Sequence, residues 1–141
     1  SGRFFATTGA NTIAERIPSG AAATGTETTA STSYVSLTGG PQVTVTTGPV
    51  ALVTVGAIMH INGTGSRVLT GFDITGATTR VEQDAETAGM DSSAPNRILT
   101  CSRTTLLTSG LTPGSNTFRQ RYRTTGDTGS FSNRHINVIP F

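Results

Sequence analysis

Residues 104–141 constrain the fold more than any other stretch of the chain. They hold three strand-like runs, which two turns rich in Gly, Pro, Asn and Asp separate. The middle run alternates with a period of two, so one face of the strand carries Phe118, Gln120 and Tyr122. The opposite face carries a row of cations, Arg119, Arg121 and Arg123. Because two or three strands bury too little apolar surface to be stable alone, the rest of the chain must supply a second sheet.

The composition favours thin strands over helices. The chain has 141 residues, of which 34% are hydrophobic and 13% charged, with 17 Gly. This length is typical of one domain with a core of its own. No run places apolar residues at helical spacing. The sequence therefore predicts an all-β protein, an antiparallel β-sandwich.

Charge and hydropathy exclude two classes of partner. Ten Arg and eight acidic residues give a net charge of +2, far from the footprint of a nucleic-acid-binding protein. No apolar run approaches the roughly 20 residues of a membrane span, so we expect neither nucleic acid nor membrane insertion. The start, SGRFF, lacks the basic region and long apolar core of a signal peptide. The lone Cys101 is expected to be a small buried hydrophobe.

Residues 1–20 are expected to form an N-terminal arm, and residues 21–141 the sandwich domain. The arm holds short apolar groups at Phe4, Phe5, Ile13 and Ile17, and Pro18-Ser19-Gly20 ends it. It is too short to close a core. Exposed Phe pairs are costly, so we expect the arm to lie against another copy of the chain. The alternative is a peripheral arm packed on its own domain.

Five more segments are expected to be strand-like, and residues 21–25 a small-residue linker. The strand-like segments are 26–37, 42–46, 50–61, 66–75 and 97–108. The run 50–61 is the most apolar and rich in β-branched residues, so it is predicted to be a central strand covered on both faces.

Two loops are candidate binding surfaces. Asn62-Gly63-Thr64 is a turn that matches the N-glycosylation triplet, and residues 82–95 form a long acidic connection. We expect both loops to face outward. Alternating carboxylates at 82, 84 and 86 resemble hard oxygen ligands, but they lack the spacing of a calcium loop, so a solvated acidic loop is preferred. The exposed-loop binding candidates are Asn62, Thr64, Arg67, Glu82, Asp84, Glu86 and Asp91.

No pattern of catalytic or metal-binding residues stands out. The chain has only His60 and His135 as imidazole bases, and neither lies beside a nucleophile motif. A metal site at His60 would need further Cys, His or carboxylate ligands, and the sequence has none close to it. We therefore expect no enzyme activity, no cofactor and no metal.

The arginine row is the strongest electrostatic feature. On one face of a strand its members lie about 6.6 Å apart. They would suit a row of carboxylates, an acidic glycan or the acidic loop of a neighbouring subunit. The plain alternative is three solvated side chains. We prefer an intersubunit role, because the chain itself supplies an acidic loop to pair with.

Several stretches together resemble a known family. TSYVSL, QVTVTTGPVALVTVGA, SRTTLLTSGLTPGSNTFRQRYR and SNRHINVIPF resemble the C-terminal β-sandwich of tailed-bacteriophage structural proteins. GRFFATTGANTIAERIP is similar to the segment that often precedes such domains. The resemblance covers most of residues 21–141. It implies a jelly-roll-like head with a tumour-necrosis-factor-like or C1q-like outline, frequently trimeric, and it brings no catalytic residues.

The resemblance implies a structural protein on the virion surface. The preferred hypothesis is a trimeric fibre or minor tail head that attaches to the host and assembles with other virion proteins, with a cell-surface glycan as a candidate ligand. The alternative is a capsid decoration or head fibre bound to the shell. A remoter alternative is a glycan-binding or glycan-hydrolysing module, but a chain with no Trp and only two Tyr offers few aromatic platforms for a sugar.

Overall fold

The computed structural model describes residues 4–9 and 12–141, with side chains described from Glu15 onward. In the described chain, strands are joined by turns and by one short 3-10 turn, η1 (Asp84–Glu86). The strands are β1 (Phe4–Gly9), β2 (Thr12–Arg16), β3 (Ser19–Ala23), β4 (Glu27–Thr29), β5 (Gln42–Thr47), β6 (Ala51–Ile61), β7 (Arg67–Gly76), β8 (Ala88–Asp91), β9 (Arg97–Leu107), β10 (Gly114–Thr124) and β11 (Gly129–Pro140).

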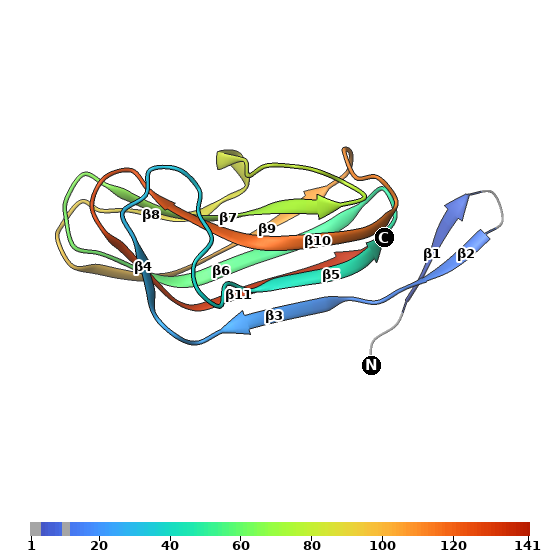
Figure 1. The fold of residues 1–141 in the computed structure, drawn as a ribbon, viewed down its shortest axis with the longest axis horizontal. Coiled ribbons are helices and arrows are strands. Elements are labelled where there is room, and N and C mark those ends of the chain that lie inside the picture. Colours follow the sequence, from blue (N-terminus) through green and yellow to red (C-terminus); the bar gives the residue numbers. More distant parts are fainter. Residues whose placement is uncertain (1–3, 10–11) are drawn as a thin grey trace.

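Two antiparallel sheets pack face to face (Figure 1). One has the order β5-β10-β7-β8, and the other has the order β3-β11-β6-β9, with β4 also pairing with β11. From β4 onward, each strand lies in the sheet opposite to the preceding one, except for the hairpin of β7 and β8. This alternation is the jelly-roll arrangement, so the predicted antiparallel jelly-roll-like sandwich is confirmed.

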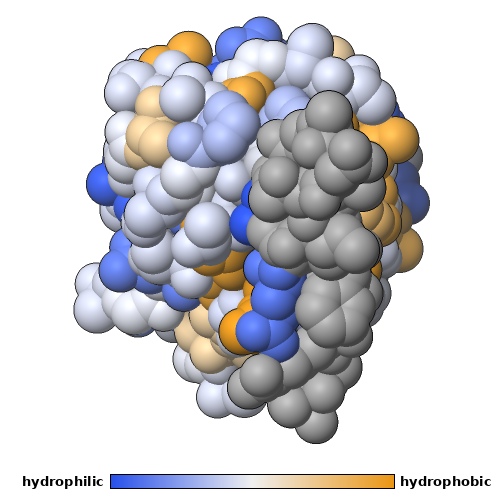
Figure 2. Space-filling model, turned by 90° about the vertical axis from the view of Figure 1, so that its right-hand side faces the viewer, coloured by the Kyte–Doolittle hydropathy of each residue, from blue (hydrophilic) through white to orange (hydrophobic). Residues whose placement is uncertain are grey.

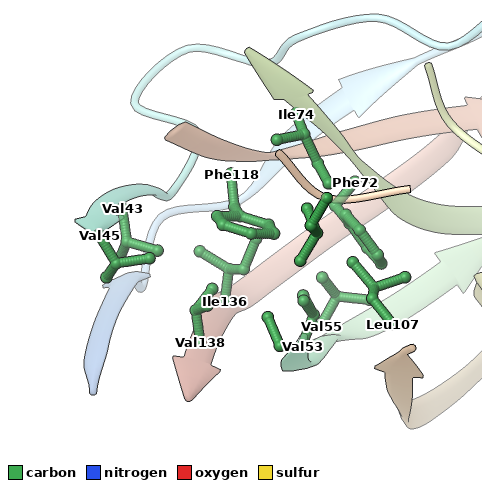
Figure 3. Packing of buried hydrophobic residues seen from close by; sticks show 12 residues of the cluster. Val43, Val45, Val53, Val55, Phe72, Ile74, Leu107, Phe118, Ile136 and Val138 are labelled. Atoms are coloured by element: carbon green, nitrogen blue, oxygen red, sulfur yellow. The ribbon is translucent and has the colours of Figure 1, made fainter. Parts of the chain in front are cut away.

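Period-two patterning builds the core between the sheets. Phe118, Gln120 and Tyr122 of β10 point inward and are at most 2% exposed, as predicted. Figure 3 shows the larger apolar cluster, in which Phe72 and Phe118 face aliphatic side chains of the opposite sheet. The labelled residues of the opposite sheet are Val53, Val55, Leu107, Ile136 and Val138, and Val43, Val45 and Ile74 come from the same sheet as the two phenylalanines. A second cluster is centred on Met59, Tyr122 and Phe131.

Polar groups are also buried in the core. The Gln120 Nε2 donates to the Gly56 carbonyl and to Thr70 Oγ1, each at 3.0 Å. Arg134 is 2% exposed, and both of its terminal nitrogens donate to the Thr38 carbonyl at 3.2 Å. Its guanidinium lies over the ring of Tyr122, 5.7 Å from the centroid. One carbonyl and one aromatic face therefore compensate part of the cost of burying this charge, while the Arg134 Nε has no hydrogen-bond partner.

Three segments differ from the expectation. The expected linker at 21–25 is largely strand β3, whose small residues pair with β11. Part of the acidic loop forms the short strand β8 on the edge of β7. The Thr-rich segment 26–37 forms only β4, followed by irregular chain that hydrogen-bonds to β10; for example, the Tyr122 amide donates to the Val35 carbonyl at 3.0 Å.

The sandwich has two distinct ends (Figure 1). The chain enters β3 from β2 at the end where the C-terminus also lies. The loops at 62–66, 92–96 and 125–128 lie together at the opposite end.

Candidate functional site

The arginine row faces outward from β10, as predicted, and all three side chains have acidic partners. Arg119 holds Asp73 of the neighbouring β7 with two hydrogen bonds, one of them 2.9 Å from Nε to Oδ1. The Nε of Arg121 lies 2.6 Å from Oε1 of Glu82. Arg123 reaches Oδ2 of Asp84 at 2.5 Å. The row is therefore neutralised locally.

These partners belong to the same chain, whereas the sequence led us to expect a neighbouring subunit's loop as the partner. Residues 82–87 fold back over their own sheet because the outward arginines attract their carboxylates. The side chains of Glu82 and Glu86 are only 12% and 18% exposed, so they do not project outward as expected. Glu86 forms two hydrogen bonds with Arg80, at 2.6 and 2.7 Å.

Tyr34 covers the same region and was not singled out by its sequence context. Its hydroxyl donates to Oδ1 of Asp84 at 2.8 Å, and the Arg123 guanidinium lies over its ring. Burial, followed by this hydrogen bond, raises the pKa of Tyr34 to about 12. The one signal in the sequence was an aromatic residue, Tyr34, within a polar segment, which indicates that this segment packs against the rest of the protein.

The acidic loop does not gather a cation site. Glu82, Asp84 and Glu86 turn to three different arginines, so their oxygens do not converge as calcium requires. In the part of the chain with described side chains, no group of three or more His, Cys, Asp or Glu is placed to hold a metal ion.

The remaining loop candidates lie at the end of the sandwich far from the C-terminus. Asn62 and Thr64 are exposed there, and Arg67 forms an exposed ion pair with Asp91. An open groove of about 460 Å³ runs between these loops. It is lined by Gly65, Ser66, Arg67, Asp91, Ser92 and Ser93.

Hydrogen bonds fix the shape of this groove. The Ser92 amide donates to the Ser66 carbonyl at 2.9 Å, and the Ser66 hydroxyl donates to Oδ2 of Asp127 at 2.9 Å. Asp127 in turn lies against Gly63, where a Cβ would come within 1.8 Å of its carboxylate. These contacts hold three loops together, and the groove itself lies between two of them, at residues 65–67 and 91–93.

The arm candidates are only partly described. The side chains of Phe4, Phe5 and Ile13 lie outside the described side chains, and the backbone of β1 and β2 forms a hairpin. Ile17 is 52% exposed and lines a recess of about 340 Å³ with Pro18 and Val45. Figure 2 shows this end of the molecule, where hydrophobic residues reach the surface among hydrophilic ones.

Among the residues with described side chains, neither histidine forms a contact with a carboxylate. His135 has one backbone contact, 3.5 Å from its Nδ1 to the Asn133 carbonyl. Among the described residues, no ion pair includes His60 or His135. The described chain also contains no helix of the length and hydropathy needed to cross a membrane.

The comparisons with known proteins identify a fold. No protein-family model matches the sequence, and no curated protein matches it. Among solved structures, Eiger TNF from S. frugiperda aligns with a TM-score of 0.57 and 14% identity, over 89% of this chain and 92% of that chain.

Two viral structures align over only part of their length. The VP2 subviral particle of infectious bursal disease virus gives a TM-score of 0.58 at 11% identity, over 96% of this chain and 36% of that chain. The Gt strain of the same virus gives 0.58 at 8% identity, over 92% and 36%. The chain thus spans about a third of these viral proteins. At such identities the likeness shows a shared jelly-roll fold.

Proposed function

We propose that this chain is a non-enzymatic structural protein of a tailed-phage virion, the trimeric head of a surface fibre or minor tail protein that mediates attachment. The observation that carries the proposal is the division of the sandwich into two ends. The chain enters from the arm at one end, and a groove between two hydrogen-bonded loops lies at the other.

This geometry suits a tethered head. A domain held at one end presents its opposite loops outward, and several weak loop contacts add when copies are tethered together. The groove offers Ser hydroxyls and the Arg67–Asp91 pair, which suit the hydroxyl groups of a cell-surface glycan. The paired arginine row on the outer sheet serves to hold the chain's own loop.

A second candidate is a capsid decoration or head fibre. Its support is the jelly-roll likeness to VP2, which in the solved structure builds a subviral particle. In that case the arm would contact the capsid shell, and the grooved end would face away from it.

Antibody labelling of intact phage particles tests the proposal. Antibodies raised against the purified chain, followed by gold-conjugated secondary antibody and electron microscopy, are expected to decorate the tail. Label on the capsid instead selects the decoration protein. Absence of label from particles whose disrupted proteins react with the same serum overturns surface display, and absence from the disrupted particles overturns a virion protein altogether.

Competition for host cells tests attachment separately. Purified protein added to host cells before phage is expected to slow adsorption, and the variant Arg67→Ala, in the groove, is expected to compete less well. The matched control is Arg103→Ala, an exposed arginine that lies outside the groove and donates to the Ala85 carbonyl. Equal competition by both variants, or none by the wild type, counts against an attachment role for the groove.

A further inference from the structure

The outer face of the five-stranded sheet lacks charge. Residues paired across an antiparallel sheet point to the same side, so the register identifies this face. Its residues, here called the uncharged face, are Gly20, Ala22, Thr28, Leu52, Thr54, Gly56, Ile58, His60, Ile98, Thr100, Ser102, Thr104, Leu106, Ser130, Ser132, His135, Asn137 and Ile139. It contains no Asp, Glu or Arg.

The charged residues of the same strands all have the opposite orientation. Glu27, Arg97 and Arg103 pair with the inward residues Phe131, Ile61 and Val55. Arg134 is buried in the core. Arg97 and Arg103 still reach water at the edge of the sheet, but on the other side of β9, so the outer face is left without charges.

Apolar side chains occupy both ends of the uncharged face. Leu52, Leu106 and Ile139 are neighbours in one row, and Ile58, His60 and Ile98 cluster at the other end. Leu106 and Ile98 are 55% and 67% exposed. Between them lie Thr54 and Thr104, which are hydrogen-bonded to each other at 2.9 Å, and Gly56, which the ring of His135 covers. The centre of the face is therefore polar, but it carries no Asp, Glu or Arg.

Two features indicate that one chain leaves this surface incomplete. The sequence of β6 predicts cover on both faces, yet its outward residues are only half-buried. At the sheet edge, β9 has 11 residues without proline, and within the described chain it pairs only with β6. Its two charged residues, Arg97 and Arg103, lie on the other side of the strand, so the outer side of this edge has no charge.

We propose that the uncharged face is the surface through which this chain associates with further copies of itself. Depletion of charge is the compositional mark of an interface core. A face without charges can converge on a symmetry axis with its own copies without like-charge repulsion. The five strands of this sheet, three of them of 11 or 12 residues, together present about 700 Å², close to the roughly 800 Å² per partner of a stable interface.

The composition of the face argues against other occupants. It offers no guanidinium or ammonium group to phosphate and no indole or phenol ring to a sugar. The uncharged face would be the contact surface of the oligomeric head proposed above. The inference rests on the proposed function in one respect, namely that several copies of the chain assemble.

Charge introduced into the face tests the inference. Thr104→Arg places a cation at the centre of the face on an exposed strand, and Leu106→Glu removes an exposed apolar contact. Light scattering after size-exclusion chromatography is expected to give the wild type a multiple of the 14.5 kDa of one chain, three times that mass for a trimer. Each substitution is expected to weaken self-association by about a hundredfold or more.

Val81→Glu is the matched control, because Val81 is 65% exposed outside this face. It is expected to keep the wild-type mass, and circular dichroism checks that every variant is folded. A monomeric wild type at about 100 µM overturns the inference. So does a folded Thr104→Arg variant of unchanged mass, or equal dissociation of the control.

The outcomes separate this inference from the proposed function. Loss of assembly in the face variants without any virion labelling leaves the interface standing and removes the phage role. If antibodies label the virion but Thr104→Arg assembles like the wild type, the phage role stands and the proposed interface is wrong. Assembly with a different virion protein alone would be seen as a monomeric purified chain, which also contradicts the inference.

Discussion

At the scale of single residues, burial decides what each ion pair contributes. The Arg121–Glu82 pair is mostly shielded, with side chains 20% and 12% exposed, whereas the Arg67–Asp91 pair is 55% and 73% exposed. Breaking a shielded pair leaves an arginine without its full hydrogen bonding, but water replaces the partner of an exposed one.

The substitution Glu82→Gln is therefore expected to lower the free energy of unfolding by about 1 to 2 kcal/mol. Asp91→Asn, the same change in the exposed pair, is expected to cost less than about 0.5 kcal/mol. Urea denaturation followed by circular dichroism measures both. Equal costs would mean that the fold-back of residues 82–87 contributes little to stability.

The raised pKa of Tyr34 predicts a change in stability at alkaline pH. The folded-state pKa is about 12, above the ordinary value of 10.0, so the folded chain holds this proton longer than the unfolded chain. The associated stability is complete below about pH 10 and is lost as the pH rises toward 12. Tyr34→Phe removes this group, so melting temperatures of the variant are expected to fall less steeply between pH 10 and 12.

Tyr122 is an internal reference for that measurement. Burial also raises its pKa, and it remains in both proteins. Identical slopes for wild type and Tyr34→Phe would contradict the buried, hydrogen-bonded state of the Tyr34 hydroxyl.

At the scale of elements, a bulge in β11 sets which residues face the core. The register with β6 shifts between Ser132 and His135, and Asn133 adopts a φ of 47°. The extra residue turns Arg134 inward and returns His135 to the outer face. Asparagine tolerates this left-handed conformation better than a residue with a plain Cβ.

Asn133→Ala is expected to destabilise the sandwich by about 1 kcal/mol, and Asn133→Gly to leave it unchanged or slightly more stable. Guanidinium denaturation of the two variants measures the difference. Alanine as stable as glycine at this position would contradict the left-handed conformation of the bulge.

The sequence predicted the elements whose alternation is long and apolar. β5, β6 and the inward face of β10 followed from regular patterns at 42–46, 50–61 and 117–123. β3 could not be recognised, because five small residues carry little strand preference and gain it only by pairing with β11. β8 is likewise a four-residue strand held by its neighbour.

The sequence predicted which charged residues form the candidate site, but not which of them pair with each other. Residue order identified both the arginine row and the acidic loop, yet it could not indicate that Glu82 lies over its own strand β10. That contact depends on the chain path from β7 to β8. The groove depends on two segments, 65–67 and 91–93, that are distant in sequence, so it appears only once the sheet is assembled.

At the scale of the whole molecule, charge is divided between two outer faces. The four-stranded sheet carries the arginine row and its acidic partners, and the outer face of the five-stranded sheet presents none. The two sides therefore suit different roles. The charged side holds the chain's own loops, and the uncharged side is free to meet copies without electrostatic guidance.

Self-association through an uncharged surface should be insensitive to salt. Between about 50 and 500 mM NaCl the dissociation constant of the wild-type oligomer is expected to change by less than about threefold, since screening acts only on charges. Sedimentation equilibrium at several salt concentrations measures this. Weakening by more than about tenfold would point to contacts through the charged face instead.

The place of β11 in the chain has a consequence for synthesis. This strand, Gly129–Pro140, lies between β3 and β6 and pairs with both, so the five-stranded layer lacks its middle until residue 140 has left the ribosome. In the interval nascent β6 can pair with β9, but β3 and β4 have no neighbour in their sheet. The layer therefore closes only after translation of the final strand, when β11 inserts between segments made much earlier.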